Sequence, residues 1–318
     1  MFEIRTINLQ LFAEMNTQTT VTGTLSPEMK TFYSDYLIDN ALPKLVHDQF
    51  GQKHPIPKNG GKIIEFRKYS PLPKLLTPLT EGVTPDGQSL TVTTITAEVA
   101  QYGGYVTLSD VLLMTAIDNN MVQATKLIGN QAGATLDTIT REVLNGGTNV
   151  VYAGGAASRD GLTEVLKVED IKKAVRALKN QNAEKIGDSF VAIIHPDVAY
   201  DLTNDPMWQA VKDYDPKDWY EGEIGRIAGV RFVETTEAKI FDGGVYSTLI
   251  LGDNAYGVTE IEGGGLEHIV KQLGSAGTAD ALNQRATVGW KATKVAERLV
   301  EQFMVRVESK SSFDGSVN

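Results

Sequence analysis

The triplet His195-Pro196-Asp197 is the most suggestive candidate for chemistry in the sequence. It follows the apolar run SFVAII and precedes VAYDL, so a histidine and a carboxylate stand where a buried strand should pass into a helix. In that setting Pro196 suits the first helical position, His195 the cap, and Asp197 the first turn, where negative charge favours the helix dipole. We therefore predict a strand-to-helix corner, while a soluble α/β hydrolase or ligand-binding protein that uses His195 and Asp197 stays an alternative.

The remaining histidines and the glycine clusters do not define an active site. His47, His54 and His268 stand far apart, and none has the i, i+4 partner of a helical metal pair. The glycines at 154–155 and 263–265 match neither a phosphate-binding loop nor a nucleophile elbow, so we interpret them as turns. We predict no catalytic residue, no metal site and no cofactor.

The densest acidic run is NDPMWQAVKDYDPKDWYEGEIG, and its part DYDPKDWYEGE begins with a partial calcium-loop pattern. Asp213, Asp215 and Asp218 have the right residue type, but Pro216 interrupts the rhythm and Ile224 stands where the closing glutamate should be. We expect instead a solvated loop with aromatic anchors, which are favoured in interfaces between subunits. The candidate anchors are Trp208, Tyr214, Trp219 and Tyr220, of which Trp208 and Trp219 are the candidate assembly contacts.

Length and composition exclude several classes of protein. The chain has 318 residues, of which 42% are hydrophobic and 22% charged, values typical of a globular protein with two connected domains. A formal net charge of -10 argues against a protein dedicated to binding nucleic acid, but not against one that surrounds nucleic acid. No apolar run approaches the roughly 18 residues of a membrane helix. The absence of cysteine excludes disulfides and thiolate chemistry.

Residues 1–57 are expected to form a leader and an arm. The opening MFEIRTINLQLFAE carries charges and has no small-residue cleavage site, which is unlike a secretion signal. The segment SPEMKTFYSDYLIDNALPKLV predicts a helix capped by Ser26. The following HDQFGQKHPIPKNGGK breaks all periodicity and is typical of a linker.

Residues 58–108 are rich in β-branched and aromatic types. Strands at 62–69 and 90–99, with the turn VTPDG between them, predict a long two-stranded hairpin, which is marginal alone and needs a partner. Its base carries a basic stripe, which fits either a solvated strand face or a contact with an acidic neighbouring subunit. The candidate assembly residues here are Lys62, Arg67, Lys68, Tyr69 and Lys74.

A long helix and a mixed region follow. Apolar residues recur three or four apart over 121–143, which predicts one continuous helix of roughly 35 to 40 Å. We assign 109–161 to this helix and its surroundings, and 162–286 to a compact mixed α/β unit. A returning strand and a polar tail complete the chain over 287–318. The fold class is α+β.

This order of parts resembles the HK97-like major capsid proteins of tailed bacteriophages. Those proteins have an N-terminal arm, an extended loop, a peripheral domain with a spine helix, and an axial domain. The segments FRKYSPLPKLLTPLTEGVTPDG, QYGGYVTLSD, FVAIIHPDVAYDL and GWKATKVAERL are similar to the family typified by the gp56-type shell protein of a coliphage. The opening INLQLFAE resembles leaders on structural proteins of phages that infect low-GC Gram-positive bacteria.

The resemblance implies a shell protein and not an enzyme. The hairpin would be the extended loop, the long helix the spine, and 162–286 the axial domain. Pentamers and hexamers of this one chain would form an icosahedral head, by way of a procapsid, around double-stranded DNA that is bound without sequence specificity. Scaffolding and portal proteins would be separate partners, no membrane would be involved, and the chain would pass from the host cytoplasm into the virion. An encapsulin-type nanocompartment shell, which has the same fold, remains an alternative.

Overall fold

The computed structural model describes residues 17–18, 46–115 apart from 80, 83 and 85, 120–212, 225–275, and 280–317 apart from 314 and 316. The predicted leader, the helix capped by Ser26, and the acidic stretch with Trp219 lie outside the described residues. The chain divides into two units. The first comprises residues 1–44, 101–135 and 265–292, and the second 45–100, 136–264 and 293–318.

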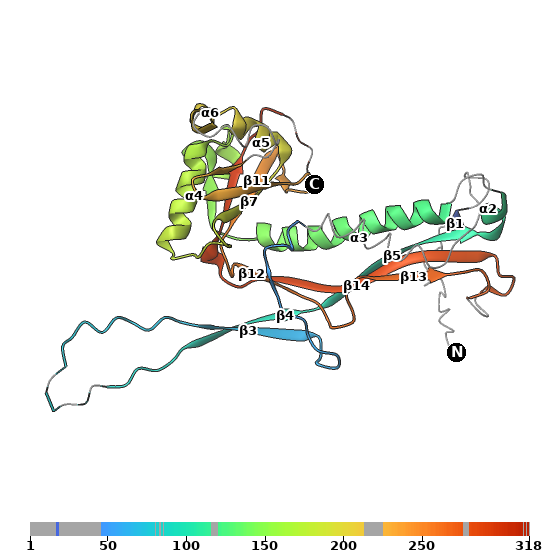
Figure 1. Ribbon diagram of the computed structural model, residues 1–318, viewed down its shortest axis with the longest axis horizontal. Coiled ribbons are helices and arrows are strands. Elements are labelled where there is room, and N and C mark those ends of the chain that lie inside the picture. Colours follow the sequence, from blue (N-terminus) through green and yellow to red (C-terminus); the bar gives the residue numbers. More distant parts are fainter. Residues whose placement is uncertain are drawn as a thin grey trace, which may run out of the picture. The chain divides into compact units, whose positions relative to one another are not determined.

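The first unit is built on long strands and one part of the long helix (Figure 1). Its strands are β1 (Thr17–Gln18), β5 (Ala100–Ser109), β13 (Glu267–Lys271) and most of β14 (Arg285–Arg298). Gly103 of β5 has to be glycine, because a Cβ there would lie 2.7 Å from the carbonyl oxygen of Trp290 in β14. The Ser109 hydroxyl accepts the Leu112 N–H at 3.2 Å and caps the short helix α2 (Asp110–Thr115).

The predicted long helix is confirmed as α3 (Asn120–Asn145), which runs through both units. It ends where the sequence places a glycine, since the Gly146 N–H still bonds the Glu142 carbonyl at 3.0 Å. In the first unit its buried face is apolar, as expected, apart from Thr125. In the second unit the buried face is mostly polar, a feature that the apolar spacing does not predict. The buried side chains there include Asp137, Thr140, Arg141 and Asn145.

The second unit contains a mixed sheet in the order β6-β15-β11-β7-β9-β8, with β10 paired to β11. The strands are β6 (Val150–Tyr152), β7 (Phe190–Ile194), β8 (Arg226–Ile227), β9 (Val230–Glu234), β10 (Ile240–Phe241), β11 (Val245–Leu251) and β15 (Met304–Ser309). Helices α4 (Val168–Asn180), α5 (Pro196–Thr203) and α6 (Pro206–Lys212) accompany it, and the core on one face joins α4 and α5 to β7. The α+β fold class is confirmed.

The C-terminal strand β15 lies inside this sheet. All its residues are buried, and it pairs with β11 from Tyr246 opposite Ser309 to Leu251 opposite Met304. A fully buried strand needs hydrogen-bonding neighbours on both edges, and β15 has them in β11 and β6. The predicted domain boundaries stay a prediction, including the return of 287–318 to the peripheral domain that the resemblance implies.

The remaining parts of the second unit are a hairpin and a small group of three strands. The predicted hairpin is confirmed: β3 (Ile63–Tyr69) pairs antiparallel with β4 (Val92–Glu98), and within the described residues with no other strand (Figure 1). Strand β12 (Tyr256–Thr259) lies between β2 (Gln52–Lys53) and the end of β14. The glycines Gly154, Gly155 and Gly263 have φ of 65°, 78° and 76°, which confirms them as turn residues. Among the described helices, none is long and apolar enough to cross a membrane.

Candidate assembly surfaces

The His195-Pro196-Asp197 triplet forms the predicted strand-to-helix corner. His195 is the N-cap of α5, where its Nδ1 accepts the Asp197 N–H at 3.2 Å, and Pro196 occupies the first turn. The Asp197 carboxylate accepts the Tyr246 hydroxyl at 2.7 Å, which ties the corner to β11. Burial lowers the pKa of His195, and the nearby Asp197 opposes this effect in part. The triplet therefore stabilises the start of helix α5. No group of three or more metal-ligating side chains occurs in the described part of the chain.

His195→Asn should weaken the dependence of stability on pH below about 6.5, the unperturbed histidine pKa. Because the folded pKa of His195 is lowered, the unfolded state takes up the proton first as pH falls, and stability is lost between about 6.5 and the folded pKa. Asparagine is also a good N-cap, so at pH 7.5 the variant should stay within about 0.5 kcal/mol of the wild type. Urea unfolding at pH 7.5 and 5.5 measures both effects.

The control for this experiment is His54→Asn, because the His54 side chain is exposed. It should leave the wild-type difference between the two pH values unchanged. A His195→Asn variant that loses as much stability on acidification as the wild type would contradict the role given to this histidine.

Five of the predicted assembly residues lie on the hairpin and are exposed. Lys62 pairs with Glu98 across the base of the hairpin, and the Arg67 guanidinium lies 3.9 Å from the Glu65 carboxylate. These ion pairs are open to water and contribute little to the stability of the subunit. The other three, Lys68, Tyr69 and Lys74, are exposed as well. Their role in assembly stays a prediction.

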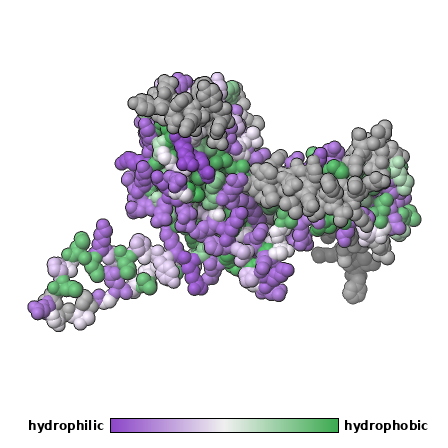
Figure 2. All heavy atoms as spheres, viewed as in Figure 1, coloured by the Kyte–Doolittle hydropathy of each residue, from purple (hydrophilic) through white to green (hydrophobic). Residues whose placement is uncertain are grey.

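The outer part of the hairpin carries apolar side chains that nothing covers within the described residues (Figure 2). Leu75, Leu76 and Leu79 are 77%, 85% and 77% exposed, and Leu72 and Leu90 are also exposed. Single exposed leucines are ordinary, but a group of them on a two-stranded ribbon marks an interaction surface. We call these five leucines the hairpin leucines. Four of them are visible in the sequence as PLPKLLTPL, but the charge pattern of this segment points to its basic residues instead.

Trp208 of α6 is a core residue and not an exposed anchor. Its side chain is 3% exposed and packs edge-to-face on Phe232 with 5.6 Å between ring centroids. A side chain buried in its own subunit is not available to a neighbour, so the structure corrects this candidate. The reason is that β9 brings Phe232 to α6, a contact that the local sequence around Trp208 does not show.

The base of the hairpin is attached by aromatic packing. Phe66 of β3 meets His54 edge-to-face at 5.8 Å between ring centroids. The same ring approaches β12 so closely that a Cβ on Gly257 would lie 3.2 Å from it. A hollow of about 570 Å³ remains beside this contact, lined by residues that include Ile64, Ile95 and Leu299. The attached base leaves the outer part of the hairpin as a projecting arm.

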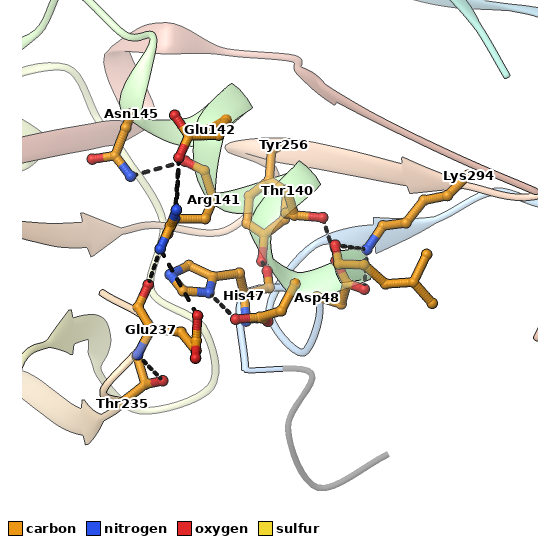
Figure 3. A network of polar contacts seen from close by, with 12 residues as sticks. His47, Asp48, Thr140, Arg141, Glu142, Asn145, Thr235, Glu237, Tyr256 and Lys294 are labelled. Carbon is orange, nitrogen blue, oxygen red and sulfur yellow. Dashed lines mark hydrogen bonds and ion pairs between the residues drawn. The ribbon is translucent and has the colours of Figure 1, made fainter. Parts of the chain in front are cut away.

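A buried polar network fixes the long helix to the segment that leads into the hairpin (Figure 3). The Asp137 carboxylate of α3 accepts the His47 N–H at 2.8 Å and lies 2.6 Å from His47 Nδ1, and both side chains are fully buried. The Tyr256 hydroxyl of β12 donates to the His47 carbonyl oxygen. Burial raises the pKa of Tyr256. His47 is therefore hydrogen-bonded to both α3 and β12.

A second branch of the network adds a buried cation (Figure 3). Lys294 of β14 pairs with Asp48 and donates to the Leu136 carbonyl at 2.8 Å, and the Thr140 hydroxyl donates to Asp48 at 2.5 Å. Burial lowers the pKa of Lys294, and the Asp48 carboxylate opposes the shift. We call His47, Asp48, Asp137, Thr140, Tyr256 and Lys294 the spine network. The only signal for it in the sequence is the spacing of Asp137 and Thr140 along one helical face.

These features together describe a structural subunit: a projecting hairpin, a long helix clamped at one end, and a mixed sheet. A model of the family of phage capsid proteins matches residues 92–302, about two thirds of the sequence. The chain belongs to the phage capsid protein family. It is therefore a structural component of a phage capsid and not an enzyme.

Solved structures show the same fold at low sequence identity. The capsid of cyanophage P-SCSP1u is 14% identical with a TM-score of 0.66, over 90% of this chain and 91% of that chain. The capsid of cyanophage Pam1 is 15% identical with a TM-score of 0.65, over 99% and 100%. A virus-like particle from Pyrococcus furiosus is 12% identical with a TM-score of 0.52, over 86% and 97%. No curated protein sequence matches the chain. The predicted HK97-like fold is confirmed.

Proposed function

We propose that the hairpin of each subunit lies across a neighbouring subunit and closes the shell through its exposed leucines. The observation that carries this proposal is the exposure of the hairpin leucines on a ribbon that, among the described strands, pairs only with itself. Many modest contacts, repeated by symmetry, give a stable closed assembly of pentamers and hexamers. The exposed Lys62, Arg67, Lys68, Tyr69 and Lys74 would add polar contacts beside the leucines.

The shell would enclose double-stranded DNA without binding it tightly. The net charge of -10 supports this proposal, because every phosphate contact would add salt-dependent affinity for the packaged genome. Scaffolding and portal proteins would be separate partners during assembly in the host cytoplasm. The similarity of FRKYSPLPKLLTPLTEGVTPDG and the other segments supports placing the chain in the gp56-type family.

A nanocompartment shell that holds an enzyme is the second candidate. The observation in its favour is the likeness to the Pyrococcus furiosus virus-like particle, although its TM-score of 0.52 is below those of the two cyanophage capsids. The match to phage capsid proteins favours a genome as cargo.

Nuclease treatment of purified particles distinguishes the two candidates. After this treatment we expect full particles to retain long double-stranded DNA, because a closed shell protects it. The control is the same treatment after the particles have been opened by heating, when the DNA should be degraded. Particles that retain a protein cargo and no DNA would contradict the proposal and favour the nanocompartment.

A further inference from the structure

The outer face of α4 carries cations with no ion-pair partner in the described structure. On this helix Lys173 pairs with Glu169 and Asp170, each at 3.1 Å, and Lys167 before the helix pairs with Glu164 at 2.7 Å. A different set, Lys172, Arg176 and Lys179, follows the spacing i, i+4, i+7 and therefore lies on one stripe. None of these three has a carboxylate oxygen of the described residues within 4.0 Å. We call them the α4 cations.

Neither the packing nor the dipole of α4 explains why three cations lie on this stripe. The opposite face of α4 is apolar and buried on β15 and β6, with Ile171, Ala174 and Leu178 at 0% exposure. Lys179 lies in the last turn, where a cation favours the helix dipole, but Lys172 lies in the first half of the helix, where it does not. Three adjacent like charges repel one another, and they stand in a chain with a net charge of -10.

The α4 cations line an open hollow that also has two apolar lining residues, Val175 and Ala228, which we call its apolar floor. The hollow measures about 400 Å³ and is lined by the three cations together with Val175, Asn180 and Ala228. The edge of the unit where α4 lies in Figure 1 is largely hydrophilic in Figure 2. A cationic rim over a small apolar floor fits a peptide that has carboxylates beside an aromatic side chain, because the ring fills the floor while the carboxylates meet the rim.

We propose that the α4 cations bind the acidic segment 213–223 of a second copy of this chain. The densest acidic stretch available is 213–223, DYDPKDWYEGE, in which five carboxylates stand against Lys217 for a net charge of -4, with Trp219 among them. A contact between two different surfaces of identical copies is heterologous, and such contacts generate rings. The inference rests on the proposed assembly of many copies, and it names one of the contacts within a ring.

Packaged DNA is the other polyanion in the particle. Nucleic acid would meet the cations through phosphates, but phosphates do not require an apolar floor in a hollow on one helix. The chain's own acidic stretch also supplies what the hollow needs, an aromatic ring between carboxylates, at one copy per subunit. The observations therefore favour a second copy, and DNA becomes an outcome of the test.

The test is a charge swap in the full chain, with assembly followed by light scattering and electron microscopy. Reversal of the α4 cations, Lys172→Glu with Arg176→Glu and Lys179→Glu, should raise the protein concentration needed for assembly by about tenfold or more. Adding Asp213→Lys, Asp215→Lys and Asp218→Lys to that variant should restore assembly toward the wild-type concentration. The charge-conserving variant Lys172→Arg with Arg176→Lys and Lys179→Arg should assemble like the wild type.

Each outcome decides for or against the inference. Neutral substitutions of the three cations by glutamine keep the test decisive if the reversed variant does not fold, and they should raise the required concentration by a smaller factor. Unchanged assembly with reduced DNA content would overturn the inference in favour of nucleic acid. Loss of assembly that the second set of reversals does not restore would overturn it as well. If the wild type itself forms no particles, the proposed function fails first.

Discussion

Asp137→Ala is expected to lower the free energy of unfolding of the unassembled subunit by about 2–6 kcal/mol, because two buried polar groups lose their partner at about 1–3 kcal/mol each. The carboxylate satisfies both the His47 N–H and His47 Nδ1, and neither side chain has access to water. Removing it leaves two buried polar atoms without this partner, and each then bears its full desolvation penalty. Chemical denaturation of the subunit at neutral pH measures the loss.

Asp188→Ala is the matched control, because Asp188 is an exposed aspartate in the same unit. It should change the free energy of unfolding by no more than about 0.5 kcal/mol, as surface substitutions usually do. A loss below about 1 kcal/mol for Asp137→Ala would mean that the spine network does not hold the helix to the segment around His47.

Replacing Leu75, Leu76 and Leu79 together by serine is expected to abolish shell formation while leaving the subunit folded. These side chains are more than three quarters exposed and contribute little to the stability of the isolated subunit. Burial of one leucine on a neighbouring subunit would contribute about 1.5–3 kcal/mol to assembly, and serine loses this contribution. Because the contact is repeated by symmetry, the loss occurs at every copy in the shell. Sedimentation velocity separates shells from free subunits.

The matched control changes three exposed hairpin residues that are already polar: Thr91→Ser, Thr93→Ser and Thr94→Ser. This variant should form shells at the wild-type concentration. The role of the hairpin leucines would be contradicted by normal shell formation in the leucine variant. Loss of its folded circular-dichroism spectrum would instead show that the leucines serve the subunit itself.

Local patterns in the sequence predicted the parts of the fold that local chemistry determines. The hairpin followed from β-branched runs around a turn, α3 from its apolar spacing, and the corner at His195 from proline and aspartate in the first helical turn. Each of these depends on residues that are close to one another in sequence.

The rest depends on contacts between distant residues. The spine network joins residue 47 to residues 137 and 256, and residue 48 to residue 294. No local pattern indicates that a lysine will be buried beside a partly buried aspartate. The same is true of β15, whose place beside β11 is fixed by pairing between segments far apart in the chain. Trp208 was misjudged for this reason, because its partner Phe232 comes from another strand.

A reconstruction of the assembled shell by electron cryomicroscopy tests the central claim most directly. We predict density for the hairpin running over an adjacent subunit, with Leu75, Leu76 and Leu79 buried against it. Density that shows the hairpin folded back on its own subunit, with the three leucines facing solvent, would contradict the claim that this hairpin joins the subunits of the shell.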